Sequence, residues 1–120
     1  MQTATVDEQL DDTFFALANS TRRAILVQLA NGEASVNELA EPFSMSLPAI
    51  SKHLKVLERA GLITRRRAGK TRPCALDTER LDEARRWVEE QYAVWSASFD
   101  RLDQRLTESS PPSKQKRNTQ

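Results

Sequence analysis

The chain has 120 residues, of which 38% are hydrophobic and 29% charged, and its formal net charge is +1. This length predicts a single domain with a limited core, and no segment approaches the roughly 20 consecutive apolar residues of a membrane span. The single cysteine, Cys74, excludes an intramolecular disulfide and an all-cysteine metal site. Residues 1–6 lack the features of a signal peptide, so we expect a cytoplasmic protein with no membrane partner.

The charges are unevenly distributed along the chain. Residues 46–72 carry eight Lys or Arg and one Glu, a balance of +7, whereas residues 77–108 carry nine acids and five Arg, a balance of −4. Positive charge concentrated on one segment is the electrostatic pattern of a protein that binds nucleic acid. The small net charge therefore conceals a candidate DNA-binding segment.

The first predicted helix covers residues 7–18 and follows a segment, 1–6, that we expect to be disordered. Acidic residues in its first turn are favoured by the helix dipole. Apolar residues recur at helical spacing and predict the face that packs against the rest of the domain. These residues are Leu10, Phe14 and Leu17, with Phe15 and Ala18 beside them.

Two shorter helices are predicted next. A break and cap at Asn19-Ser20 separates the first helix from a second, over 21–30. A short extended segment at 34–36 leads to a third helix that ends at Phe43. Pro42 lies late in this short helix, where its ring is poorly tolerated, so we expect an irregular last turn there.

Residues 46–61 show the clearest helical pattern. Ser46 suits the N-cap, Pro48 suits the first turn, and Gly61 suits the position that ends the helix. Apolar residues at 50, 54 and 57 predict one buried stripe. The remaining positions carry hydroxyl, imidazole and basic groups, which can contact base edges and phosphates in a major groove: Ser51, Lys52, His53, Lys55 and Arg59. With the helix before it, this segment predicts a helix-turn-helix.

A simpler interpretation exists for this helix, because basic residues on a solvated helix face are common. His53 could likewise be an ordinary surface histidine. The combination of Ser51, Lys52 and His53 directly before a basic hairpin is narrower, and we interpret the helix as a DNA-recognition helix.

The hairpin is predicted from two strands, 62–67 and 72–76, joined by a glycine-bearing connection at 68–71. We interpret it as the wing of a winged helix-turn-helix, which reaches phosphates or a minor groove. The alternative is a charged edge that only prevents other strands from pairing with it. The basic residues that we assign to DNA contact here are Arg65, Arg67, Lys70 and Arg72.

A long last helix, over 79–107, holds both tryptophans and more apolar surface than its own domain can cover. Large apolar patches of this kind mark interfaces, so we predict a homodimer; the alternative is that the helix packs across its own domain. The predicted domain covers 7–108, and we expect 109–120 to be disordered. The predicted dimer interface consists of Leu10 and Phe14 from the first helix and Leu81, Val88, Tyr92, Trp95, Phe99 and Leu102 from the last.

Several of these segments resemble the ArsR-type (arsenic-repressor-like) family of bacterial transcriptional regulators. The resemblance rests on FALANSTRRAIL at 15–26, MSLPAISKHLKVL at 45–57, AGLI at 60–63 and the basic Gly-Lys turn, and it extends from about Phe14 to Leu106. It implies a mainly α-helical winged helix-turn-helix homodimer, with about five helices and a hairpin wing. It also implies binding to an inverted-repeat promoter operator, usually with repression.

The resemblance places the operator contacts in the predicted recognition helix. The residues that it implies are Ser46, Leu47, Ser51, Lys52 and His53. Our predicted DNA-binding set adds Pro48 and Lys55 from the same helix and the four basic hairpin residues. The partner is double-stranded DNA.

Many members of this family respond to metals, and here the sequence departs from that pattern. The metalloid-binding cysteines would fall near Ser35 and Asn37, which are not thiols, and residues 77–108 contain no histidine. One His and one Cys cannot form a tetrahedral nitrogen and sulfur site within a protomer. We therefore expect a member of the metal-free branch, with no metal or cofactor and with an inducer, if one exists, that is an unknown small molecule.

Two other functions compete with that of a DNA-binding repressor. A protein-interaction module could reuse the winged fold and dock a partner through the last helix. An enzyme is not expected, because no catalytic arrangement or phosphate-binding loop is present. Cys74 follows Arg72 closely, which could lower its pKa and make it a redox sensor, but we interpret it as a packing residue.

Overall fold

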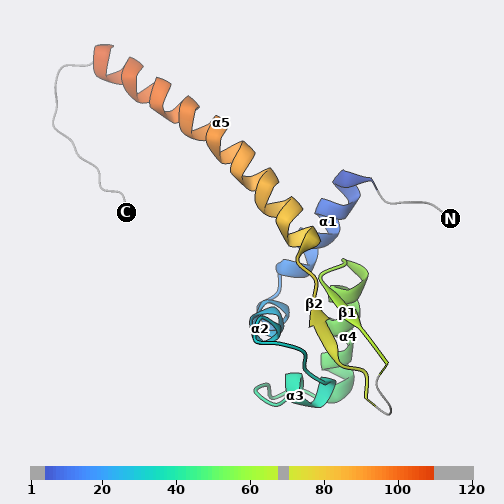
Figure 1. The fold of residues 1–120 in the computed structure, drawn as a ribbon. Coiled ribbons are helices and arrows are strands. Elements are labelled where there is room, and N and C mark those ends of the chain that lie inside the picture. The colour runs from blue at the N-terminus through green and yellow to red at the C-terminus, as the bar shows by residue number, and fades with distance from the viewer. Residues whose placement is uncertain (1–4, 68–70, 110–120) are drawn as a thin grey trace. The chain divides into compact units, whose positions relative to one another are not determined.

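The computed structural model describes residues 5–67 and 71–109, and Figure 1 shows their arrangement. The fold is mainly helical with one antiparallel hairpin, which confirms the predicted class. The chain divides into two units, one up to Arg85 and the other from Arg86 onward. The elements are α1 (Val6–Leu17), α2 (Ser20–Leu29), α3 (Val36–Ala40), α4 (Leu47–Arg59), β1 (Ile63–Arg65), β2 (Cys74–Leu76) and α5 (Glu79–Ser109).

The helix boundaries follow from side chains that cap them. The Thr5 hydroxyl accepts a hydrogen bond from the Glu8 backbone N–H at 3.1 Å, and the Glu8 carboxylate accepts one from the Thr5 N–H at 3.0 Å. This reciprocal capping starts α1 one residue before the predicted position. The remainder of the N-terminal segment that we expected to be disordered, 1–4, lies outside the described residues, as does 110–120 at the other end.

The buried face of α1 differs from the predicted stripe. Leu10, Thr13 and Ala16 are buried, whereas Phe14 and Phe15 are 40% and 62% exposed. The prediction of a buried Phe14 is therefore wrong for the protomer. Thr13 is tolerated on the buried row because its hydroxyl donates to the Gln9 carbonyl at 2.9 Å, which removes the cost of an unsatisfied group.

The helix-turn-helix is formed by α3 and α4. Helix α3 ends at Ala40, three residues before the predicted end at Phe43, so its predicted length is wrong. The chain around Pro42 forms an irregular turn, as predicted, in which the Phe43 N–H donates to the Ala40 carbonyl at 3.0 Å. Ser46 is the N-cap of α4, with its Oγ accepting from the Ala49 N–H at 3.2 Å, as predicted. Gly61 ends the helix with φ of +80°, a conformation that favours glycine.

The hairpin pairs β1 and β2 antiparallel, with Arg65 opposite Cys74. Both strands are shorter than predicted. The segment before α3 adds a further pairing, because Ala34 and Cys74 exchange two backbone hydrogen bonds of 3.1 and 2.8 Å. This pairing attaches the base of the hairpin to the α2–α3 connection.

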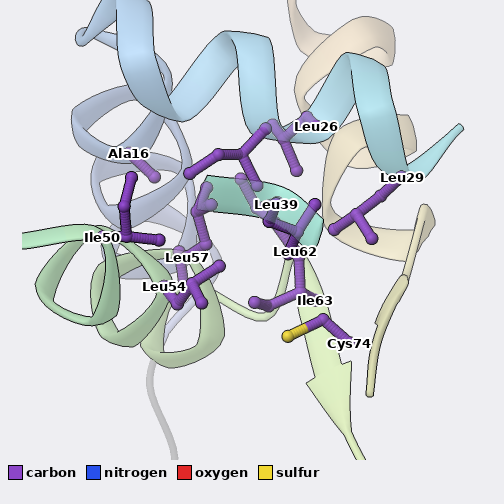
Figure 2. Packing of buried hydrophobic residues seen from close by; sticks show 12 residues of the cluster. Ala16, Leu26, Leu29, Leu39, Ile50, Leu54, Leu57, Leu62, Ile63 and Cys74 are labelled. Atoms are coloured by element: carbon purple, nitrogen blue, oxygen red, sulfur yellow. The ribbon is translucent and has the colours of Figure 1, made fainter. Parts of the chain in front are cut away.

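The core lies between α2, α3, α4 and the hairpin, as Figure 2 shows. The residues at 50, 54 and 57 form the buried stripe of α4, as predicted. Cys74 is fully buried in this cluster near Ile63, and burial raises the pKa of its thiol. A reactive thiol requires a lowered pKa, so the structure supports the packing role for Cys74.

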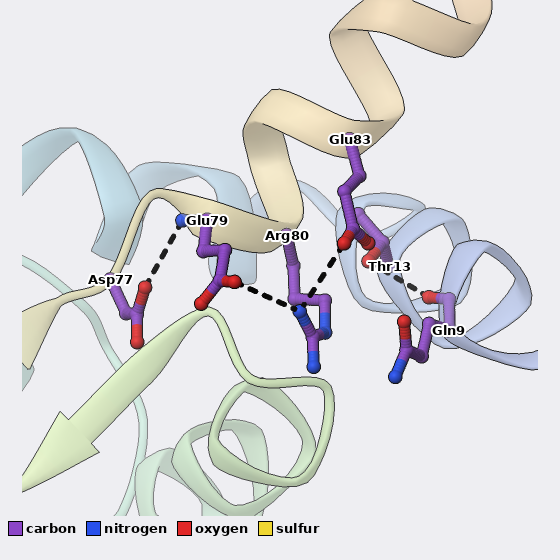
Figure 3. A network of polar contacts seen from close by, with 6 residues as sticks. All are labelled: Gln9, Thr13, Asp77, Glu79, Arg80 and Glu83. Atoms are coloured by element: carbon purple, nitrogen blue, oxygen red, sulfur yellow. Dashed lines mark hydrogen bonds and ion pairs between the residues drawn. The ribbon is translucent and has the colours of Figure 1, made fainter. Parts of the chain in front are cut away.

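Polar contacts define the start of α5 (Figure 3). The Asp77 carboxylate accepts from the Glu79 N–H at 3.0 Å, and the Arg80 guanidinium lies 3.9 Å from Glu79 and 3.5 Å from Glu83. The aliphatic part of Arg80 covers Gly61, where an added Cβ would lie only 3.2 Å from the Arg80 Cγ. In the described parts of the chain, no helix combines the length and apolarity needed to cross a membrane.

Candidate nucleic-acid interface

Helix α4 presents one continuous exposed face. Pro48, Lys52, Lys55 and Arg59 recur every three or four residues and are all exposed, opposite the buried stripe. At the start of the helix Leu47 is 47% exposed, and an apolar side chain there can contact a thymine methyl group. The helix therefore offers a basic face and an apolar tip, both of which suit a major groove.

Two predicted contact residues are less exposed than this face. Ser51 and His53 are half-buried, at the edges of the exposed face. The His53 Nδ1 lies 3.3 Å from an Nη1 nitrogen of Arg22, which belongs to α2. Burial, and then the positive charge of Arg22, lower the pKa of His53 below its usual range. His53 therefore lies at the junction of α2 and α4, and only part of its ring can face DNA.

The arginines of the hairpin face different sides, because successive side chains along a strand alternate in direction. Arg65 shares the inward face of β1 with the buried Ile63, because residues two apart on a strand point the same way. Its side chain is only 12% exposed and lies 3.8 Å from Glu58 of α4. The prediction that Arg65 contacts phosphate is therefore corrected: Arg65 joins the hairpin to α4.

Arg66 faces the opposite way and forms a bidentate ion pair with Glu33. Its Nε and Nη2 donate to the two carboxylate oxygens of Glu33 at 3.1 and 2.6 Å. This hydrogen-bonded pair lowers the pKa of Glu33 and raises that of Arg66. Since Glu33 precedes α3, the pair joins the first strand of the hairpin to the helix-turn-helix.

The pairing leaves a defined set of free cations. In the described ranges, 5–67 and 71–109, five basic residues of the +7 segment take part in no ion pair and are exposed. Unpaired exposed cations can replace the counterions of phosphates without first breaking a protein contact. They are Lys52, Lys55 and Arg59 on α4 and Arg67 and Arg72 on the hairpin; Lys70 lies outside the described residues.

Arg22 is a residue that the sequence reasoning missed. It is 8% exposed and donates to two carbonyls of α1, at Phe15 and Ala16. A signal for it was present, because Arg22 is three residues before Ile25 and seven before Leu29, on the buried row of α2. Glu33 carried no such signal, since its partner lies 33 residues away.

The predicted dimer residues divide into two groups. Leu10 is buried within the protomer, and Leu81 packs against the core. The other six are large apolar residues that are 40% to 66% exposed: Phe14 on α1 and Val88, Tyr92, Trp95, Phe99 and Leu102 on α5. The second unit therefore has an apolar stripe that its own helix leaves uncovered.

The described residues contain no group of three or more His, Cys, Asp or Glu placed to hold a metal ion. At the positions where metalloid sensors have cysteines, Ser35 is the N-cap of α3 and its hydroxyl accepts from the Glu38 N–H. Its oxygen thus has a structural role in starting α3.

Comparison with known proteins agrees with this geometry. Residues 19–65 match the family described as "Bacterial regulatory protein, arsR family". The HTH-type transcriptional regulator Rv2034 of Mycobacterium tuberculosis is 45% identical over 83 residues, which cover 65% of this chain and 78% of that protein. The transcriptional repressor SdpR of Bacillus subtilis is 34% identical over 79 residues, which cover 66% of this chain and 88% of SdpR.

Solved structures show the same fold. A crystal structure of the ArsR family transcriptional regulator RHA00566 has a TM-score of 0.72 and 42% identity, and the match covers 78% of this chain and 97% of that one. The solution structure of a homodimeric winged helix-turn-helix DNA-binding domain from Mycobacterium bovis, a possible ArsR-family regulator, has a TM-score of 0.59 and 30% identity, covering 78% and 90%. The chain is therefore a winged helix-turn-helix transcriptional regulator. It belongs to the ArsR family.

Proposed function

We propose that this protein is a homodimer that binds an inverted-repeat operator in double-stranded DNA and represses transcription. Two α4 helices enter successive major grooves about 10 base pairs apart, and the hairpins contact flanking phosphates. The observation that carries the proposal is the exposed face of α4, on which Lys52, Lys55 and Arg59 form no ion pair with any residue in the described ranges. Repression, rather than activation, follows the similarity to the repressor SdpR.

The stripe on α5 supports the homodimer. Val88, Tyr92, Trp95, Phe99, Leu102 and Leu106 are separated by alternating steps of four and three residues, and each is at least 42% exposed. This 3.5-residue period keeps one seam facing a partner helix along the whole stripe. A similar protein, the winged helix-turn-helix domain from Mycobacterium bovis, is homodimeric, which supports a dimer here.

The remaining parts of the proposal follow from DNA binding. A regulator that binds chromosomal DNA acts where that DNA lies, so we place it in the cytoplasm. We propose no enzymatic activity, because the free side chains of the exposed face of α4 and of the hairpin are cations suited to phosphates. Any inducer is a small molecule rather than a metal held by this chain's own cysteine and histidine.

Fluorescence anisotropy on a labelled duplex from the region upstream of its own gene tests the proposal. We expect tight binding that exceeds binding to a scrambled duplex and that weakens steeply with salt. In Lys52→Ala with Lys55→Ala, the slope of log K against log salt should become shallower by about 0.9 for each phosphate that the variant no longer neutralises.

The matched control is Arg86→Ala with Arg101→Ala, which removes two positive charges from α5 and should leave the salt slope unchanged. Equal, weak binding to both duplexes by the wild type would contradict operator recognition. That result would favour a protein partner for the α5 stripe. Equally weakened binding in both double variants would show that net charge, rather than the α4 face, determines binding.

A further inference from the structure

Arg22 is a buried arginine that forms no ion pair with an acidic residue among those that the structure describes. Its guanidinium donates from Nε to the Ala16 carbonyl at 2.8 Å and from Nη2 to the Phe15 carbonyl at 2.9 Å. Both carbonyls belong to the last turn of α1, where the helix dipole is negative, and the Phe15 carbonyl also accepts from the Ala18 N–H at 3.1 Å. The guanidinium also stacks on the Phe15 ring, 5.2 Å from its centroid. These contacts orient Arg22 firmly against α1.

The third nitrogen of the guanidinium, Nη1, faces the recognition helix. Nη1 lies 3.3 Å from the Nδ1 of His53 on α4. Arginine has only donors and keeps its charge, so Nδ1 must accept and cannot carry a proton. A neutral imidazole whose Nδ1 is unprotonated carries its proton on Nε2, on the other side of the ring. The contact therefore determines both the charge and the tautomer of His53.

We propose that Arg22 is a positioning residue for DNA recognition, which holds the His53 ring neutral with its Nε2–H free to donate to an acceptor on the DNA. The inference rests on the proposed operator binding and adds a role that the exposed face of α4 does not supply. Arg22 also connects the end of α1, which carries the exposed Phe14, to α4, the proposed recognition helix. Burial and the Arg22 charge both lower the pKa of His53, in agreement with the geometry.

The first test needs no DNA. His53 is the single histidine of the chain, so its imidazole signals in nuclear magnetic resonance are unambiguous. We expect a His53 pKa below 6.5 in the wild type and a higher value in Arg22→Gln. Arg23→Gln is the matched control, because Arg23 is the next residue and donates to the Leu17 carbonyl instead. A His53 pKa that is the same in Arg22→Gln and wild type would overturn the proposal.

The second test measures operator affinity. Arg22→Gln should bind roughly tenfold more weakly than the wild type, the effect of one charged hydrogen bond. If Arg22 acts through His53, the same substitution should have little further effect in a His53→Ala background. An equal reduction of affinity in both backgrounds would mean that Arg22 only caps α1, and the proposal would fail.

A third comparison leaves Arg22 intact, in case Arg22→Gln does not fold. His53→Gln places an amide donor near the Nε2 position, whereas His53→Asn places an acceptor near Nδ1 but lacks the outer donor. We expect His53→Gln to retain more operator affinity than His53→Asn, and the reverse order would contradict the proposed donor. Failure of the wild type to bind any operator would refute the proposed function, while the pKa comparison would still test the contact between Arg22 and His53.

Discussion

At the scale of single residues, partners decide what each charged side chain can do. Arg65 and Arg66 are neighbours in a basic run, yet Arg65 turns inward to Glu58 and Arg66 pairs with Glu33. Arg67 remains exposed and free of ion pairs in the part of the chain that the structure describes. Only the last of the three is available to a phosphate without breaking a contact.

The pKa of His53 predicts how stability depends on pH. Its folded-state pKa lies below the unfolded value of about 6.5, so the unfolded state binds the proton more readily. The free energy of unfolding should therefore fall as pH drops through about 6.5, until the folded state is protonated too. Urea denaturation of the wild type and His53→Gln between pH 8 and 5.5 measures this.

His53→Gln lacks the titrating ring, so its free energy of unfolding should change less between pH 8 and 5.5 than that of the wild type. Glu33 does not interfere, because its lowered pKa means that its contribution is lost only at pH values below 4.5. If the stability of the wild type and of His53→Gln changed with pH in the same way, the lowered pKa of His53 would be contradicted.

At the scale of elements, caps determine where α4 begins and ends. Ser46 accepts from the Ala49 N–H, and Gly61 takes the positive φ that ends the helix. Both features were predicted from the sequence, because capping depends on residues within one turn of each other. The predicted β-strands were too long, because their regular pairing covers only Ile63–Arg65 and Cys74–Leu76.

Ser46 is also a predicted DNA contact, and two substitutions separate its roles. Ser46→Ala should lower the free energy of unfolding by about 1 kcal/mol, because the Ala49 N–H loses its acceptor. Ser46→Asp keeps a capping oxygen and should retain stability, but its negative charge should weaken operator binding. Thermal denaturation and anisotropy on both variants measure the two effects. Unchanged operator affinity in Ser46→Asp would remove Ser46 from the DNA interface.

At the scale of the whole molecule, the two units have different surfaces. The first, up to Arg85, has its own core and carries the basic face of α4. The second is part of a single helix, and its aromatic side chains are exposed in the protomer. A helix that exposes Tyr92, Trp95 and Phe99 in one row requires a partner to remove them from water.

Substitutions on α5 test whether that partner is a second copy. Trp95→Glu should weaken dimerisation at least tenfold, since burying an aromatic side chain contributes about 1.5–3 kcal/mol and a tenfold change corresponds to about 1.4. Val94→Glu is the control, because Val94 is 59% exposed but lies off the seam. Analytical ultracentrifugation measures both. A monomeric wild type, or equal effects of the two variants, would contradict the α5 seam.

The sequence by itself determined the class of fold, the caps of α4, its buried stripe and the basic character of the hairpin. Each depends on residues close together in the chain, whose spacing reports a helix face or a turn. The apolar excess of the last helix, from which the interface was predicted, was also visible in the sequence. Family membership agrees with these local signals.

Only the tertiary structure decided which basic and apolar residues are covered. Arg22 and His53 are 31 residues apart, and Glu33 and Arg66 are 33 apart, so no local pattern pairs them. Phe14 and Thr13 are neighbours, and the exact rotation of α1 against the core decides which of them is buried. Spacing locates a helix face to within about one residue, whereas contacts between elements determine the charge state and the partner of each side chain.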